Sequence, residues 1–152
     1  MRCAMCGKGT VRNGRVEMKR AIAGHVFVAT VRGHKCGACG EDYFDDNDIE
    51  RTDLVIARAL VDEGIVSGEA FKFVRKAAGL RAADLAELLK VTKETVSRWE
   101  TDRVPIDHAA RALLATMLAD REAGGTRTQD VLRALRAPKL LGKRVKLGFS
   151  EG

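Results

Sequence analysis

Four cysteines arranged as two C-x-x-C pairs constrain this chain more than any other feature of its sequence. The pairs are Cys3-x-x-Cys6 and Cys36-x-x-Cys39, and they use all four cysteines of the chain. A C-x-x-C turn directs two thiolates at one point, and two such turns complete a tetrahedral metal shell. Gly7 and Gly40 directly follow the pairs and let the backbone turn tightly behind the ligands. The sequence therefore predicts one Zn²⁺ per chain, structural because a closed four-thiolate shell leaves no open position.

The same four ligands also suit an iron site of the rubredoxin type, and a dithiol redox pair is a further alternative. A redox pair needs a single C-x-x-C at the start of a helix, which two glycine-backed pairs do not resemble. The N-terminus lacks an apolar signal region, and no window approaches the roughly 20 apolar residues of a membrane span. We therefore expect a cytoplasmic protein without membrane association, where paired cysteines bind metal more often than they form disulfides.

Residues 1–46 are expected to form a small zinc-ribbon-like β domain that depends on its metal to fold. Val16, Met18 and Ile22 are apolar among polar neighbours, although the alternation breaks at Lys19-Arg20, and residues 25–31 are β-branched and apolar. Ala23-Gly24 between them predicts a turn, so an antiparallel hairpin brings the cysteine pairs together. His34 is close to the second pair, but four cysteines already fill the shell, so we expect it on the hairpin surface.

Residues 47–66 predict a helical linker. Asn47 or Asp48 is expected to cap it and Gly64 to end it. Its thin apolar stripe is available to pack on either domain or on a second copy of the chain; the stripe consists of Ile49, Leu54, Ala57 and Val61.

Residues 67–137 predict five short helices and hence a compact all-α domain. Ser67, Thr92, Asp107 and Thr128 are expected caps, because side-chain oxygens accept from free N–H groups at helix starts. The apolar residues expected to face inward are Phe71, Val74, Ala78, Leu85, Ala86, Leu89, Ala110, Leu113, Leu114, Met117, Leu118, Val131, Leu132 and Leu135. Together with the first domain, this organisation predicts the α+β class. Residues 138–152 form a basic tail, either a solvated terminus or an arm that adds phosphate affinity.

The stretch from Val91 to Arg103 predicts a helix that fits a DNA groove. Thr92 caps it, and Val96 and Trp99 share one buried face. The opposite face is polar and suits base edges and phosphates. A formal charge of +6 and a pI near 9.4 favour a polyanionic partner.

Residues 80–105, L-R-A-A-D-L-A-E-L-L-K-V-T-K-E-T-V-S-R-W-E-T-D-R-V-P, resemble the helix-turn-helix of the lambda-repressor-like (Xre) family. With the two C-x-x-C pairs before it, the chain over residues 1–122 resembles the MqsA-like antitoxins, a YgiT-type zinc finger followed by an Xre domain. The resemblance implies an antitoxin that binds an mRNA-cleaving toxin through its N-terminal domain. It also implies a transcriptional repressor that binds operator DNA as a dimer through its C-terminal domain.

By the same resemblance, Glu94 and Arg98 read bases, with Arg98 suited to guanine. Glu94 replaces the family's usual amide, and it is expected to accept from cytosine or to orient Arg98. Arg81 takes the place of a Ser/Thr that begins the second helix, and it is assigned a phosphate contact. The remaining DNA-binding positions are Lys93, Thr95, Ser97, Thr101 and Arg103. Leucines of the fourth helix are candidates for the dimer contact or for the domain's own core.

Two alternatives remain open at this point. One is a stand-alone zinc-containing Xre regulator without a toxin, and the other is the thiol redox protein. No Ser/His/Asp or paired-carboxylate constellation is present in the sequence, so we expect no enzyme.

Overall fold

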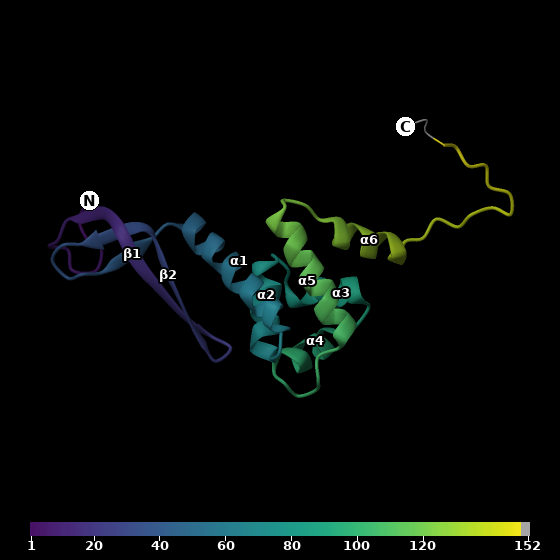
Figure 1. Cartoon of the computed structure of the whole chain (residues 1–152), viewed down its shortest axis with the longest axis horizontal. Coiled ribbons are helices and arrows are strands. Elements are labelled where there is room, and N and C mark those ends of the chain that lie inside the picture. Colours follow the sequence, from purple (N-terminus) through teal and green to yellow (C-terminus); the bar gives the residue numbers. More distant parts are fainter. Residues whose placement is uncertain (150–152) are drawn as a thin grey trace.

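The computed structural model describes residues 1–149 and shows a small antiparallel sheet followed by helices (Figure 1). This confirms the predicted α+β class. The elements in chain order are β1 (Val11–Ile22), β2 (His25–Cys36), β3 (Asp42–Phe44), α1 (Asp46–Glu63), α2 (Gly68–Ala77), α3 (Ala82–Leu89), α4 (Lys93–Glu100), α5 (His108–Glu122) and α6 (Arg127–Arg136). Among residues 1–149, no helix combines the length and the apolar character that crossing a bilayer requires.

The long β1–β2 hairpin has the predicted turn. Ala23 and Gly24 have φ values of 54° and 81°, the left-handed pair that closes a two-residue hairpin. The strands run unbroken through Lys19-Arg20, where the apolar alternation of the sequence breaks, and half-buried Arg20 pairs there with Asp53 of α1 at 2.6 Å. The short strand β3, which the sequence did not indicate, pairs with residues 33–35 of β2.

Helix α1 starts two or three residues earlier than predicted, because its N-cap is Asp45 rather than Asn47 or Asp48. Gly64 ends it in the left-handed conformation, as predicted. The predicted apolar stripe is only partly right, since Ala57 is buried but Ile49, Leu54 and Val61 are half-buried. Ile56 and Leu60 are fully buried instead, because α1 packs against α2 and α5 on that side.

The caps of α2, α4 and α5 are the predicted ones. Ser67, Thr92 and Asp107 each accept a hydrogen bond from the backbone N–H three residues later. The core of helices α2 to α5 is largely as predicted, except that Leu88 of α3 is buried in place of Leu89, and that Leu89 of α3 and Leu113 of α5 are only half-buried. Leu114 and Leu118 of α5 are buried in the chain's own core, which leaves them unavailable to a second copy.

Helix α6 differs from its prediction. Its N-cap is Thr126, and the N–H of Thr128 donates to Asp120 of α5 at 2.7 Å. Val131 and Leu135 are 54% and 70% exposed, whereas Leu132 packs against the core. The helix presents one narrow side to α3 and α5, so only part of its apolar surface is covered. The tail is exposed through residue 149, and residues 150–152 of the predicted tail lie outside the described residues.

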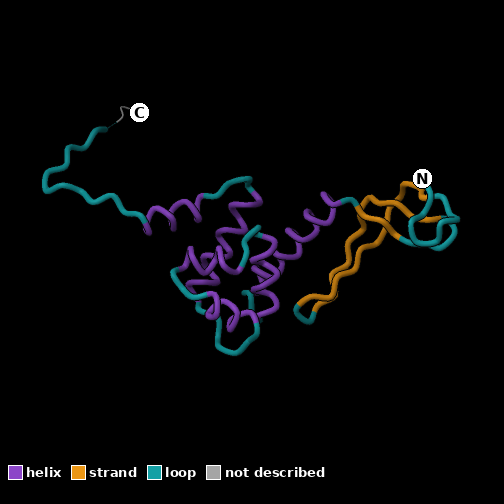
Figure 2. Tube along the Cα trace, turned by 180° about the vertical axis from the view of Figure 1, so that it is seen from behind, coloured by secondary structure: helices purple, strands orange, loops and turns teal. Residues whose placement is uncertain are grey.

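The tip of the hairpin packs against the helices (Figure 2). Ile22 belongs to the same buried cluster as Leu60 and Phe71, and Phe27 lies at its border. The guanidinium of Arg20 lies 5.7 Å from the ring centre of Phe73 on α2. The core of the helical half therefore extends onto the tip of the hairpin, whereas buried Val16 and Met18 lie outside that cluster.

Candidate metal centre and nucleic-acid interface

The four cysteine sulfurs converge on one point. All four Sγ atoms lie within 4.8 Å of one another, with Cys3 and Cys39 separated by 3.7 Å and Cys6 and Cys36 by 3.8 Å. A tetrahedral metal with bonds of about 2.3 Å to sulfur requires sulfur atoms about 3.8 Å apart. The cysteines are free of disulfide bonds. The four thiols therefore fit a single tetrahedral metal ion.

Two matching turns hold the cysteines in place. The N–H of Gly7 donates to the carbonyl of Cys3 at 2.9 Å, and the N–H of Gly40 donates to the carbonyl of Cys36 at 3.1 Å. Both glycines have left-handed φ values, 66° and 74°. This confirms the turning role predicted for the residues that follow each pair.

Donors around the sulfurs stabilise negative charge on them. Backbone N–H groups of Gly9 and Ala38 lie 3.4 Å from the sulfurs of Cys6 and Cys36. The hydroxyl of Tyr43 donates to the sulfur of Cys3 at 3.1 Å, and chiefly this bond lowers the pKa of Cys3 to about 6. A thiolate, the form that binds metal, is thereby favoured at this position.

The pKa of the fourth thiol, Cys39, is shifted in the opposite direction to that of Cys3. A hydrogen bond from the backbone of Glu41 lowers the pKa of Cys39, but desolvation and the three neighbouring sulfurs outweigh it and raise that pKa to about 12. A bound metal cation removes this repulsion, because it supplies positive charge at the centre of the four sulfurs.

Gly9 and Tyr43 are site residues that the sequence did not reveal. A Cβ on Gly9 would lie 2.2 Å from the sulfur of Cys36, so only glycine fits there. The one sequence signal that could have singled out Tyr43 is that it is the single tyrosine of the chain. His34 bonds Asn13 and faces Asp45, outside the cysteine cluster, as predicted.

Helix α4 is shorter than the predicted stretch, and it ends at Glu100 before a turn. Its inner face is as predicted, with Val96 and Trp99 buried. Thr95 is half-buried beside the cap, and the other residues predicted to meet DNA on this stretch are exposed, namely Lys93, Glu94, Ser97, Arg98, Thr101 and Arg103.

The exposed side of α4 carries a shallow hollow of about 320 Å³, lined by Glu94, Ser97, Arg98, Thr101 and Arg103. Within residues 1–149, the side chains of Glu94, Arg98 and Arg103 take part in no ion pair or hydrogen bond. The structure therefore brings together one acidic and two basic groups that are not engaged inside the chain.

Arg81 lies apart from this surface, at the start of α3. Its side chain is 83% exposed and donates twice to the carboxylate of Asp84, at 3.0 Å each. These hydrogen bonds hold the pKa of Asp84 below its ordinary value. The predicted phosphate contact therefore competes with a pair inside the helix.

A buried ion pair fixes the end of α4 against α2. Arg75 of α2 and Glu100 of α4 are only 7% and 9% exposed, and the Nε of Arg75 donates to Glu100 at 2.5 Å. A second nitrogen of Arg75 donates to the carbonyl of Leu80 at 2.8 Å. Arg75 was missed in the sequence, because its partner is 25 residues away.

Close packing at Gly68 completes the attachment of α4. The N–H of Gly68 donates to Asp102 at 2.8 Å, and a Cβ at Gly68 would lie 2.5 Å from the carbonyl oxygens of Trp99 and Glu100. The rings of Phe71 and Trp99 meet edge to face at 5.8 Å. The polar face of α4 is thus presented on a rigid support.

The fold and the four-cysteine site define a chain in which a small sheet that could hold a metal ion precedes an all-helical half. The chain belongs to the family of MqsA, the antitoxin component of a bacterial toxin–antitoxin system, and the family model matches residues 1–123. No curated protein sequence matches the chain. Membership of an antitoxin family implies a toxin as partner and a regulatory role. The match ends before α6, so that helix and the tail lie outside it.

Replacing Gly9 by alanine should prevent metal binding, because the added methyl group occupies the space of the Cys36 sulfur. Metal analysis of the purified protein should give about one ion per chain for the native protein and much less for Gly9→Ala. Gly14→Ala is the matched control, since nothing lies within 4 Å of a Cβ at that position. Full metal content in Gly9→Ala would contradict the geometry of the site.

Replacing Arg75 by alanine should lower the free energy of unfolding by about 3–5 kcal/mol, because the buried carboxylate of Glu100 loses the one ion-pair partner that it has among residues 1–149. Urea unfolding measures the change. Arg58→Ala, which removes an exposed arginine of α1, should change the free energy by less than about 0.5 kcal/mol. Equal effects of the two substitutions would show that the buried pair does not stabilise the helical half.

Proposed function

We propose that this chain is a zinc-stabilised antitoxin that also represses transcription, binding DNA through α4 and a toxin through its N-terminal half. The observation that carries the proposal is the pairing of a closed four-thiolate site with an exposed, rigidly supported polar helix in a member of an antitoxin family. Each part is argued below from its own residues.

Zinc is the proposed metal, held by Cys3, Cys6, Cys36 and Cys39. Four thiolates at tetrahedral spacing suit Zn²⁺, which has no redox chemistry and serves as a structural cross-link. Neither cysteine pair opens a helix, since both lie in turns beside the sheet, and this argues against a thiol redox function. The metal ties the ends of the hairpin together, and no further chemistry is assigned to it.

The proposed DNA contact is made by a helix-turn-helix of α3 and α4. Arg98 is exposed on α4 and suits the O6 and N7 atoms of guanine in the major groove. Glu94 lies one turn earlier, forms no ion pair with Arg98 within the described chain, and accepts from the amino group of cytosine. Phosphate contacts are assigned to Lys93, Ser97, Thr101 and Arg103. Thr95 supports the start of the helix beside them. Arg81 adds a further phosphate contact if its side chain leaves Asp84.

One domain makes only a few base contacts and therefore has limited sequence specificity. We propose that two copies bind a palindromic operator. The homodimer contact is assigned to the helical half. Leu114 and Leu118 are excluded from it because they are buried within one chain.

The proposed toxin is an mRNA-cleaving protein encoded beside this chain. Family membership supports a toxin partner, and the exposed sheet leaves a surface for it. Producing the neighbouring small protein alone should arrest growth, and co-production of this chain should restore it. A neighbour that is harmless alone would contradict the antitoxin role and favour a stand-alone regulator.

Replacing Arg98 by alanine should cost about 1–3 kcal/mol of operator affinity and relax selection at one base pair, because a bidentate guanine contact is lost. Fluorescence anisotropy with the promoter of the chain's own operon measures the affinity. Arg133→Ala, on exposed α6, is the matched control and should bind like the native chain. Native affinity in Arg98→Ala would show that α4 does not read this position.

A further inference from the structure

The outer edge of β2 has free backbone groups. Cys36 donates to Glu41 on the β3 side of the strand, whereas Gly37 donates to Thr10 on the β1 side. Because successive residues of a strand point their backbone groups to opposite sides, the even-numbered residues of β2 point away from β1. β3 covers this edge only at residues 33–35. Val28, Thr30 and Arg32 therefore present unpaired N–H and C=O groups.

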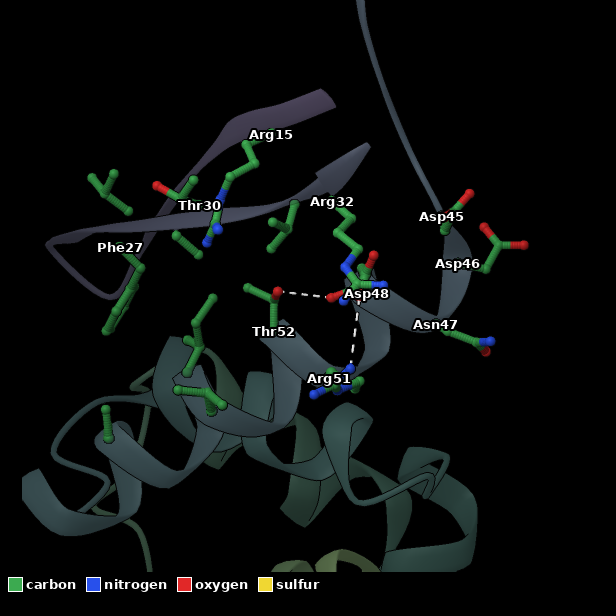
Figure 3. A pocket seen from close by; sticks show the side chains of 16 residues that line it. Arg15, Phe27, Thr30, Arg32, Asp45, Asp46, Asn47, Asp48, Arg51 and Thr52 are labelled. Carbon is green, nitrogen blue, oxygen red and sulfur yellow. Dashed lines mark hydrogen bonds and ion pairs between the residues drawn. The ribbon is translucent and has the colours of Figure 1, made fainter. Parts of the chain in front are cut away.

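This edge borders a groove of about 1220 Å³ whose opposite wall is α1 (Figure 3). Six consecutive residues of β2, from Phe27 to Arg32, line the groove, as expected where a strand presents its edge rather than one face. The wall from α1 includes Thr52, Val55 and Ile56. Val28 and Val55 are 56% and 70% exposed, so the groove has an apolar middle that is open to solvent.

Two unpaired arginines lie at one end of the groove. Arg15 and Arg32 are directly opposite each other on β1 and β2, and Figure 3 shows both side chains reaching toward α1. Like charges in this position destabilise a sheet. Asp45, Asp46 and Asp48 line the same groove, but no carboxylate of the described chain lies within ion-pair distance of either arginine; Asp45 faces His34 and Asp48 faces Arg51. An anionic group from outside the chain would relieve the repulsion.

We propose that this groove receives an extended strand of the toxin, which adds to the edge of β2 and places a carboxylate against Arg15 and Arg32. The proposal rests on the proposed antitoxin function. Main-chain hydrogen bonds to the edge of β2 supply affinity, and side chains packed near Val28 and Val55 and paired with the arginines supply selectivity.

A second copy of the chain suits the groove less well. β2 contains Arg32 and Lys35 but no acidic residue, so pairing two copies of β2 brings like charges together. α1 also stands opposite the edge, which leaves room for a strand beside β2 but sets the two α1 helices against each other in a self-pair. An acidic strand from another protein meets neither obstacle.

Proline substitutions at opposite edges of the hairpin test the proposal. Thr30→Pro removes an N–H from the groove edge, whereas Glu17→Pro removes one from the outer edge of β1 at the same level, since Glu17 and Thr30 are cross-strand partners. The probe is the protein encoded beside this chain's gene, titrated by calorimetry into the full-length chain. Thr30→Pro should weaken binding at least about tenfold, and Glu17→Pro should bind like the native chain.

A charge reversal gives a second, independent readout. Arg15→Glu combined with Arg32→Glu should weaken binding by a similar factor, while Arg12→Glu, on the same hairpin but outside the groove, should not. Metal content and the thermal midpoint of each variant confirm that the hairpin is folded.

Four outcomes would overturn the proposal: native affinity in Thr30→Pro, native affinity in the double arginine variant, equal weakening by both prolines, or dissociation by Thr30→Pro of a homodimer of the chain alone. A native chain that does not bind the neighbouring protein at all would instead overturn the antitoxin function itself.

Discussion

The buried ion pair between Arg75 and Glu100 is the interaction on which the helical half depends. It joins α2 to the end of α4, and a second bond from Arg75 holds the chain that leads into α3. Burying two charges is costly, and the cost is offset only where the geometry is fixed. The pair therefore specifies one position for α4, and the edge-to-face packing of Trp99 on Phe71 attaches α4 to α2 a second time. Arg98 and Glu94 are exposed at defined places because the opposite side of their helix cannot shift.

At the other end of the molecule, a four-cysteine site that could hold a metal ion takes the place of an apolar core. The turns around the cysteines contain few large apolar side chains, and the sulfurs of Cys3 and Cys36 are themselves the buried groups. The hairpin connects the cysteine site to the helices. Val16 and Met18 are buried along it, and Ile22 at its tip belongs to the same buried cluster as Phe71. The two ends are connected through the tip of the hairpin, where Ile22 joins the buried cluster of the helices. A toxin on the hairpin and DNA on α4 are expected to bind different surfaces of the chain.

Local signals made much of this structure predictable. Caps such as Ser67 and Thr92, the Ala23-Gly24 turn and the cysteine spacing act over a few residues, and each is found as expected. What the sequence did not indicate depends on distant partners. Asp120 receives the N–H at the start of α6 because α5 lies beside it, and Tyr43 reaches Cys3 from 40 residues away. The pairing of β3 and the groove along β2 likewise follow from tertiary packing, which periodicity does not encode.

The central claim is that one chain joins a metal-dependent toxin-binding half to a DNA-reading half. Its most direct test is capture of the native full-length chain from its own cells, followed by sequencing of the bound DNA and identification of the bound protein. The account predicts a palindromic sequence upstream of the chain's own operon, together with the protein encoded beside it. Recovery of DNA that shares no common sequence, without that protein, would contradict the account.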